Sequence, residues 1–411
     1  MSAPASCRLC GHDLRLTFVD LGMSPLCERF LRADQLNEME PFYPLHVWIC
    51  ESCLLVQLES YVGREEIFTD DYAYFSSFST SWLEHARAYA QRMTTELGLG
   101  PESRVVELAS NDGYLLRHFV DLGVGVLGID PAANVAEAAR AVGVETIVEF
   151  FGAAVAERVV AERGHADLIV ANNVLAHVPD LNDFISGMRI LLAPGGTVTI
   201  EMPHVVRLIE GLQYDTIYHE HFSYFSLHSL VRAFAQNDLE LFDVEELRSH
   251  GGSLRIFVRH PNGDGPAGSV HDLLDREAAD GYDTVEGYLG FGAAVADAKA
   301  SLLELLIAAR RDGKSVAGYG APGKGNTLLN YCGIRTDLIE YTVDRNPGKH
   351  GMFLPGTHIP VHPPERLAET QPDVIVILPW NLQREIAEQL AYTQEWGAQL
   401  VVPIPDAQVI S

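Results

Sequence analysis

The sequence predicts an α/β protein in which a small metal-binding module precedes two doubly wound α/β units. Two C-x-x-C pairs near the N-terminus indicate the module, and at two later places an apolar strand passes through a glycine turn into a helix. A length of 411 residues suits two or three domains. We place the module at residues 1–70, the first α/β unit at 71–262 and the second at 263–411.

The charge of the chain limits its partners. Twenty-nine basic residues against 56 acidic ones leave a formal net charge of -27, which repels phosphate backbones and anionic lipid. Nucleic acid and membranes are therefore not expected as partners. Residues 1–7 contain no apolar signal region, and no apolar run reaches ~18 residues. We therefore expect a cytoplasmic protein whose six cysteines are thiols or metal ligands.

Four of the cysteines form the two pairs, Cys7 with Cys10 and Cys50 with Cys53. Each C-x-x-C turn directs two thiolates toward one point, and two such turns complete a tetrahedral sulfur site for zinc. All four positions would be filled by protein ligands, so the metal is expected to be structural rather than catalytic. A redox pair and chance spacing are the alternatives.

The first α/β unit begins with a helix at about residues 81–97. Apolar strands follow at 104–109, 124–129, 167–171 and 196–200, and residues 249–258 are predicted to form the last strand of this sheet. A parallel sheet of this kind binds its ligand at the carboxyl ends of the strands. There a turn with Gly113 follows the first strand and Asp130 closes the second, an arrangement in which the acid binds ribose hydroxyls.

The residues at these strand ends favour S-adenosylmethionine (SAM) over a nicotinamide cofactor. The turn carries one glycine rather than the three that admit a pyrophosphate. Phe151 is expected to cover the adenine, and Asn172 to lie on the methionine side. The predicted cofactor-binding residues are Glu107, Ser110, Asn111, Gly113, Asp130, Phe151 and Asn172. Another nucleotide-binding fold is the alternative, and Asn172 would then cap the next turn.

Histidines, a glutamate and aromatic residues gather in the stretch Tyr214–Ser226. The H-E-H spacing does not place two histidines on one helix face, which argues against a zinc-protease site. A carboxylate beside imidazoles and apolar rings suits proton abstraction from a weak acid near neutral pH. His177, after the third strand, is predicted to approach the same edge. A purely structural role is the alternative in both cases.

In the second α/β unit, a helix at about 291–311 leads to a strand and glycine loop at 315–326, and strands follow at 339–343 and 373–378. The loop nearly matches a phosphate-binding loop, but Gly325 stands where the Mg²⁺-binding serine or threonine belongs. Hydrolysis of a nucleoside triphosphate is therefore not expected. Gly323, Lys324 and Asn326 are predicted to bind a diphosphate; a plain glycine turn is the alternative.

Together these segments resemble a known family. The paired C-x-x-C module, E-L-A-S-N-D-G, N-N-V-L-A-H-V-P-D, Y-D-T-I-Y-H-E-H-F-S-Y-F-S and G-Y-G-A-P-G-K-G-N-T are similar to nucleotide-sugar C-methyltransferases of antibiotic deoxysugar pathways, of the tetronitrose C-3′-methyltransferase type. The resemblance covers essentially the whole chain. It implies a zinc-binding N-terminal domain, a SAM-binding Rossmann-like middle domain and a second Rossmann-like domain that binds the nucleotide sugar.

The resemblance also implies a reaction, methylation at C-3 of a thymidine-diphosphate-linked 4-keto-deoxyhexose. His221 would be the general base, with Tyr218, Glu220 and His177 around the reacting carbon and Tyr224 on the substrate. An N- or O-methyltransferase and a non-catalytic scaffold are the alternative functions. The substituent at C-3, the stereochemistry and the oligomeric state do not follow from the sequence.

Overall fold

The structure is a computed structural model that describes residues 5–63 and 75–410. The chain forms two compact units, and neither is one continuous stretch of sequence. The first unit comprises residues 1–14, 50–204 and 222–287, and the second comprises 15–49, 205–221 and 288–411. The predicted boundary between residues 70 and 71 lies outside the described residues, and the division into three consecutive domains stays a prediction.

A seven-stranded sheet in the order β10-β11-β8-β7-β4-β5-β6 forms the centre of the first unit. Five of its strands are parallel, and β10 and β11 extend it in antiparallel fashion. The strands are β4 (Arg104–Leu108), β5 (Gly125–Ile129), β6 (Thr146–Ile147), β7 (Ala166–Asn172), β8 (Leu192–Pro203), β10 (Glu240–Leu247) and β11 (Ser253–Arg259). The helices are α2 (Thr80–Glu96), α3 (Leu116–Asp121), α4 (Ala133–Ala141), α5 (Ala153–Arg163), α6 (Leu181–Leu191), α8 (Leu227–Gln236) and α9 (Gly268–Ala279).

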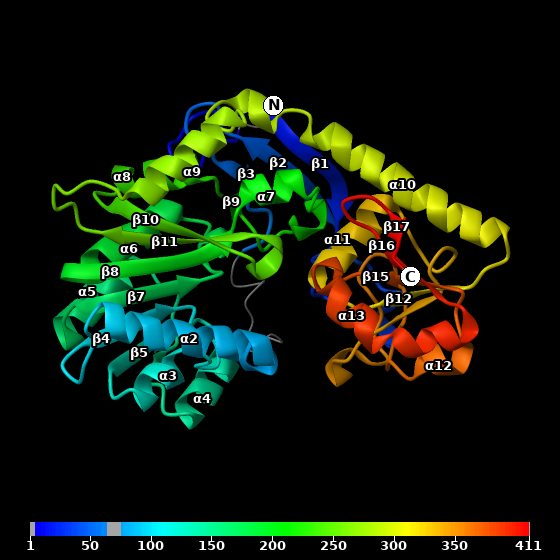
Figure 1. Ribbon diagram of the computed structural model, residues 1–411, viewed down its shortest axis with the longest axis horizontal. Coiled ribbons are helices and arrows are strands. Elements are labelled where there is room, and N and C mark those ends of the chain that lie inside the picture. The colour runs from blue at the N-terminus through cyan, green and yellow to red at the C-terminus, as the bar shows by residue number, and fades with distance from the viewer. Residues whose placement is uncertain (1–4, 64–74, 411) are drawn as a thin grey trace. The chain divides into compact units, whose positions relative to one another are not determined.

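Helices cover both faces of this sheet because each has one apolar side. The buried residues of α2 are Ala86, Tyr89, Ala90 and Met93, which recur at helical spacing. They pack with α3, α4 and apolar side chains of β4 and β7 in one core. Figure 1 shows α2, α3 and α4 on one side of the sheet and the packed pair α5 and α6 on the other. The predicted α/β class, the helix and the four parallel strands are thus confirmed.

One predicted strand is shorter than expected. Residues 249–258 were predicted to be continuous, but residues 249–251 form a 3-10 turn and β11 begins at Ser253. Gly251 and Gly252 have φ values of 90° and 120°, a conformation that interrupts a strand and that glycine adopts readily. The first unit also contains β3 (Val56–Leu58), which pairs with β9 (Ser223–Tyr224).

The second unit is also α/β, with a sheet in the order β14-β13-β12-β15-β16-β17. Its strands are β12 (Val316–Tyr319), β13 (Tyr341–Val343), β14 (Val361–His362), β15 (Val374–Ile377), β16 (Gln399–Val402) and β17 (Gln408–Val409), of which β17 is antiparallel to its neighbour. Its helices are α7 (Val205–Glu210), α10 (Phe291–Arg311), α11 (Gly323–Cys332), α12 (Arg366–Thr370) and α13 (Gln383–Gln389). The predicted helix at 291–311 is confirmed in α10.

An antiparallel hairpin from the N-terminal region belongs to this second unit. It consists of β1 (Leu16–Ser24) and β2 (Tyr43–Ile49). Phe18 of β1 stacks on Phe291 at the start of α10, with ring centroids 4.6 Å apart. The hairpin therefore packs on the second α/β unit, although it lies between the two cysteine pairs in the sequence.

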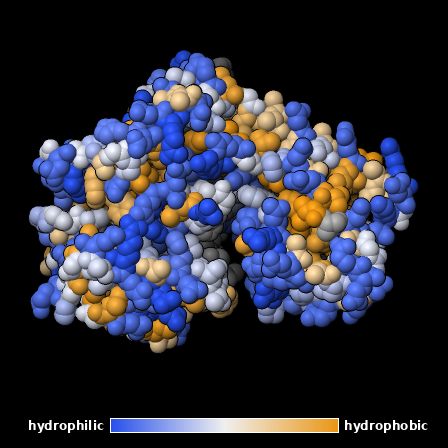
Figure 2. All heavy atoms as spheres, viewed as in Figure 1, coloured by the Kyte–Doolittle hydropathy of each residue, from blue (hydrophilic) through white to orange (hydrophobic). Residues whose placement is uncertain are grey.

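The visible surface is mostly hydrophilic. In Figure 2 hydrophilic residues cover most of the visible face of each unit, and hydrophobic residues form scattered groups. Within the described ranges, no helix is long and apolar enough to cross a membrane.

Candidate active site and metal centre

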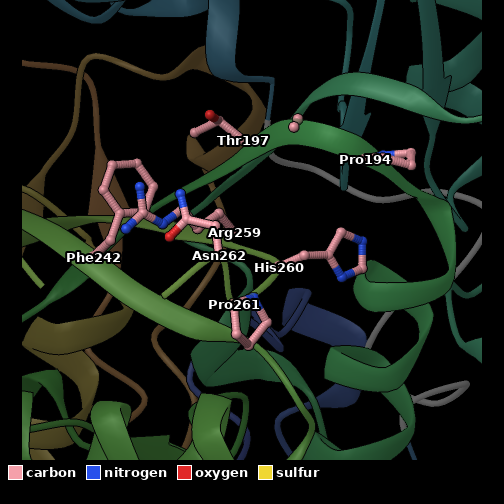
Figure 3. Close-up of a pocket in the computed structure, with 9 residues that line it drawn as sticks. Pro194, Thr197, Phe242, Arg259, His260, Pro261 and Asn262 are labelled. Carbon is pink, nitrogen blue, oxygen red and sulfur yellow. The ribbon is translucent and has the colours of Figure 1, made fainter. Parts of the chain in front are cut away.

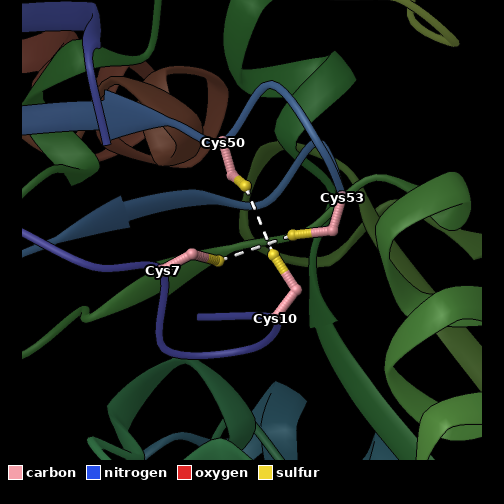
Figure 4. A group of neighbouring side chains, drawn as sticks. All are labelled: Cys7, Cys10, Cys50 and Cys53. Atoms are coloured by element: carbon pink, nitrogen blue, oxygen red, sulfur yellow. Dashed lines mark hydrogen bonds between the residues drawn. The ribbon is translucent and has the colours of Figure 1, made fainter. Parts of the chain in front are cut away.

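The four paired cysteines meet at one point of the first unit (Figure 4). The Cys7 and Cys53 sulfurs are 3.5 Å apart, as are those of Cys10 and Cys50, and all four lie within 4.8 Å of one another. Four thiolates at Zn–S distances of about 2.3 Å require separations of this size. The residues fit a closed structural zinc site.

The turn after β4 is held by a carboxylate at the end of the neighbouring strand β5. Asp130, at the end of β5, accepts the Asn111 N–H at 2.8 Å and the Ala132 N–H at 2.9 Å. Burial raises the pKa of Asp130, and these two hydrogen bonds oppose that rise. Gly113 has φ +76°. Asp130 therefore fixes the turn through backbone contacts, and its predicted bond to ribose hydroxyls stays a prediction.

Several buried acceptor atoms at this edge fit a ligand rich in hydrogen-bond donors and positive charge. Among the described residues, both Glu107 carboxylate oxygens, Ser110 Oγ, Asp112 Oδ1, Asn172 Oδ1 and Asn173 Oδ1 have no hydrogen-bond partner. Glu107 has no exposed surface, and burial raises its pKa well above the usual value. Buried polar groups are rarely left unpaired. SAM supplies an ammonium, a sulfonium and ribose hydroxyls, so the set fits that cofactor.

The remaining predicted cofactor residues have protein contacts as well. Asn172 Nδ2 donates to the Tyr114 hydroxyl at 3.4 Å. Phe151 is buried and packs edge-on against Phe184, with ring centroids 5.3 Å apart. Asp112 and Asn173 were not among the predicted residues, although both follow directly on a predicted residue and their unpartnered oxygens mark the same edge.

Replacing Gly113 with alanine is expected to destabilise the protein and to weaken SAM binding. An L-residue in the left-handed conformation costs ~1–2 kcal/mol, and an added Cβ would lie 3.3 Å from the Ala139 Cα. Gly143→Ala is the matched control, because Gly143 has φ +86° but an added Cβ would meet no atom within 4 Å. Urea unfolding should show losses in both variants, larger for G113A, and calorimetry should show weaker SAM binding only in G113A. Equal SAM affinity in the two variants would contradict a role for this turn.

A charged network at the end of β8 was not predicted. Glu201 is fully buried and pairs in the sheet with Asn172. It accepts hydrogen bonds from His85 Nε2 and Arg255 Nη2, both at 2.8 Å, and from Ser249 Oγ at 2.7 Å. Burial alone would raise the pKa of Glu201, but His85 and Arg255 lower it to about 2. The network therefore keeps the Glu201 carboxylate ionised beside Asn172, one of the predicted cofactor-binding residues.

A hollow of about 550 Å³ lies elsewhere on the same sheet (Figure 3). It is lined by residues 194–197, Phe242 and residues 259–262. Thr197 pairs with Leu168 near the start of β7, whereas the cofactor edge lies at the end of that strand. Arg259 stacks over Phe242 and forms an ion pair with Glu240 at 3.0 Å, so its positive charge is already neutralised within the protein. The hollow therefore lies away from the strand ends that carry the predicted cofactor residues.

In the second unit, the candidate base has a defined tautomer. His221 Nδ1 lies 2.9 Å from the Thr216 carbonyl oxygen. A carbonyl oxygen can only accept, so Nδ1 carries a hydrogen, and in the neutral imidazole Nε2 then carries the lone pair. The Tyr218 ring lies beside the imidazole, with centroids 4.0 Å apart. The structure thus brings Tyr218 and His221 together, with the basic nitrogen of His221 defined.

The other histidine of this stretch contacts strand β2. His219 is buried, its Nε2 lies 3.2 Å from the Pro44 carbonyl oxygen, and its ring meets Tyr43 edge-on. Glu220 lies near a thiol, with 4.0 Å between its Oε1 and Cys27 Sγ. Burial, and then the charge of Glu28, raise the pKa of Glu220 to about 8. At neutral pH Glu220 is therefore mostly protonated and can donate a hydrogen bond.

Replacing Glu220 with glutamine should reduce the loss of stability as the pH rises from about 5 to about 8. The pKa of Glu220 is about 8 in the folded protein against an ordinary value of 4.5. Between these values the folded chain holds a proton that the unfolded chain releases, so stability falls as pH rises, by at most about 1.4 kcal/mol per pH unit. Glutamine removes this dependence. Urea unfolding at about pH 5 and about pH 8 should show a smaller decrease for E220Q than for the wild type; equal decreases would contradict the raised pKa.

His177 and Tyr224 lie in the first unit. His177 ends a 3-10 turn of residues 175–177, and Tyr224 is in β9 opposite Val56. The Phe222 N–H donates to the Ala176 carbonyl oxygen at 2.7 Å. The chain therefore enters the first unit, directly after His221, beside the turn that carries His177.

The predicted phosphate loop is occupied by side chains of its own unit. The Gly323 N–H donates to the Glu28 carboxylate. Lys324 Nζ contacts Asn381 Oδ1 and lies 4.2 Å from the Trp380 ring centroid. Asn326 is buried and donates to the Cys27 carbonyl oxygen. A diphosphate at this loop would have to bind chiefly through Lys324, and this binding stays a prediction.

Comparisons with known proteins identify the parts of the chain. Residues 7–68 match a zinc binding domain, residues 82–244 a methyltransferase domain and residues 248–405 a C-methyltransferase C-terminal domain. The chain is 37% identical over 406 residues to the C-methyltransferase NovU of Streptomyces niveus, covering 98% of this chain and 96% of that protein. A stretch of 97 residues is 32% identical to the ubiquinone biosynthesis O-methyltransferase of Bordetella avium strain 197N, covering 23% of this chain and 40% of that protein.

The crystal structure of the glycopeptide N-methyltransferase MtfA is 16% identical and covers 43% of this chain and 96% of that one, with a TM-score of 0.34. The four cysteines are positioned to bind a metal within a zinc-binding domain, and β4 with the turn after it belongs to a SAM-dependent methyltransferase domain. The identity with NovU extends over nearly the whole of both proteins. The chain belongs to the C-methyltransferase family.

Proposed function

We propose that this C-methyltransferase methylates C-3 of a thymidine-diphosphate-linked 4-keto-deoxyhexose through an enolate that His221 forms. A C–H bond becomes acidic when an adjacent carbonyl can hold the resulting charge, so this substrate requires a base at C-3 and a donor at the C-4 oxygen. The observation that carries the proposal is the bond between His221 Nδ1 and the Thr216 carbonyl oxygen at 2.9 Å, because it leaves Nε2 as the proton acceptor.

The roles of the neighbouring groups follow from their chemistry. A neutral carboxyl such as Glu220, or the hydroxyl of Tyr218, can donate a hydrogen bond to an enolate oxygen. His177 is the third candidate for this role, and Tyr224 for contact with the sugar. A well-aimed donor of this kind contributes ~10²–10³-fold in rate.

On the cofactor side, Glu107, Ser110, Asn172 and the turn at Gly113 would hold SAM, with Phe151 and Asn111 beside it. When bound, SAM supplies an electrophilic methyl group. Among the described residues the buried Glu107 carboxylate forms no ion pair, and its burial favours a positively charged ligand.

The test is a product assay. The protein is incubated with SAM and a panel of thymidine-diphosphate-linked 4-keto-deoxyhexoses that differ at C-3, and mass spectrometry and NMR give the mass gain and its position. We expect one added methyl group on C-3 of at least one sugar. In deuterated buffer without SAM, the C-3 hydrogen should exchange. A methyl group on nitrogen or oxygen, or no exchange with a sugar that is methylated, would overturn the proposal.

A further inference from the structure

The carbonyl that fixes the tautomer of His221 belongs to a turn that is held by a distant tryptophan. Thr216 ends the 3-10 turn of residues 214–216, and its neighbour Asp215 has no exposed surface. Asp215 Oδ2 accepts a hydrogen bond from Trp380 Nε1 at 2.7 Å. Trp380 lies 165 residues further along the chain, in the loop after β15.

Other contacts also hold this turn. The Tyr214 ring meets the Tyr331 ring edge-on, with centroids 5.5 Å apart, and the Tyr214 hydroxyl lies 3.6 Å from Cys332 Sγ in α11. Thr216 Oγ1 donates to the Gln213 carbonyl oxygen at 2.7 Å, a local bond that moves with the turn. Thr327 Oγ1 in α11 donates to the Ile217 carbonyl oxygen at 3.1 Å, after the turn has ended. The bond between Asp215 and Trp380 joins the turn itself to another element through a buried carboxylate, which costs most when it loses its partner.

The tryptophan is itself fixed in place. Lys324 Nζ lies 4.2 Å from the Trp380 ring centroid, within the range of a cation–π contact. The charge of Lys324 also acts on Asp215, whose pKa burial raises to about 6. At neutral pH Asp215 is therefore mostly ionised, and a charged acceptor makes the stronger hydrogen bond with the indole N–H.

We propose that Trp380 is a positioning residue for the base. Its Nε1–H holds Asp215, Asp215 sets the turn, and the Thr216 carbonyl of that turn keeps the hydrogen of His221 on Nδ1. The proposal rests on the proposed function, since it concerns the same base. Trp380 touches no reacting atom in this scheme, and its effect is to keep the neutral imidazole in the tautomer that can accept a proton at Nε2.

The test uses Trp380→Phe, which retains an aromatic ring and removes the N–H donor. Trp396→Phe is the matched control, because Trp396 Nε1 also donates to a buried acceptor of the same unit, the Pro372 carbonyl oxygen at 3.1 Å. The protein is labelled with ¹⁵N-histidine, the signal of His221 is assigned by its absence in His221→Asn, and the tautomer is read without substrate. Methylation kinetics are measured separately.

We expect the Nδ1–H tautomer alone in the wild type and in W396F, and a mixture with the Nε2–H tautomer in W380F. The kcat of W380F should fall on the order of tenfold to a hundredfold with little change in KM. Asp215→Asn, a weaker acceptor of the same shape, should shift the tautomers in the same direction. An unchanged tautomer in W380F and D215N, or the same shift in W396F, would overturn the proposal. Because the tautomer is read in the absence of substrate, this result is independent of whether the acceptor is a sugar.

Discussion

A His221→Asn variant is expected to lose roughly 10²–10⁴-fold in the rate of C-methylation, the usual contribution of a positioned general base. Asparagine can still donate its amide hydrogen to the Thr216 carbonyl, which lies 2.9 Å from His221 Nδ1 in the wild type. The amide has no basic nitrogen, however, so the proton of the acceptor carbon stays in place. Exchange of that hydrogen with deuterated buffer, measured by NMR without SAM, should therefore disappear together with methylation.

The matched control is His219→Asn, two positions earlier in the same stretch. His219 is also held by a carbonyl, that of Pro44 at its Nε2, but its side chain is buried and its ring meets Tyr43 edge-on. H219N should retain exchange even if it lowers stability. If H221N exchanged the substrate hydrogen at the wild-type rate, another group would be the base, and loss of exchange in H219N alone would assign it to His219.

The parts of the fold that the sequence predicts well are those with a local signal. The helix at 291–311 has an apolar side that recurs at helical spacing, and α10 has these same bounds. The strand ending at Leu108 and the glycine turn after it follow from residues that adjoin one another. The four zinc ligands are separated in the chain, but the spacing within each pair and the affinity of thiolate for zinc make them recognisable.

The contacts that position the site have no such signal. Asp215 and Trp380 are 165 residues apart, and no pattern in either segment indicates the other. His85, Glu201 and Arg255 come from a helix and two strands whose neighbouring positions follow only from the assembled sheet. Glu28 reaches the Gly323 N–H because the hairpin of the N-terminal region packs on the second unit, which composition does not reveal. Tertiary pairing of this kind requires the structure.

Removing zinc is expected to have the largest effect on stability. Structural zinc contributes roughly 10–16 kcal/mol of apparent binding free energy in small domains, as much as the whole stability of many proteins. The turn that carries Cys7 and Cys10 also contacts residues next to predicted site residues. Arg8 of this turn donates a hydrogen bond to the Pro179 carbonyl oxygen at 2.8 Å, and its guanidinium group lies over the Phe222 ring. Pro179 is two residues after His177 in the sequence, and Phe222 directly follows His221. Loss of the metal should therefore lower both the unfolding temperature and the methylation rate.

Two serine substitutions distinguish the cysteines of the zinc site from a cysteine outside it. Cys10→Ser removes one sulfur ligand, whereas Cys332→Ser changes a buried thiol that lies 3.6 Å from the Tyr214 hydroxyl and far in sequence from the cluster. Metal analysis should find one zinc per chain in the wild type and in C332S, and less in C10S, whose unfolding temperature should fall toward that of the chelator-treated wild type. The four thiolates would then account for both the metal and the stability, because a closed sulfur site loses affinity when any ligand is replaced. Full zinc content in C10S would instead place the metal outside the four-cysteine cluster.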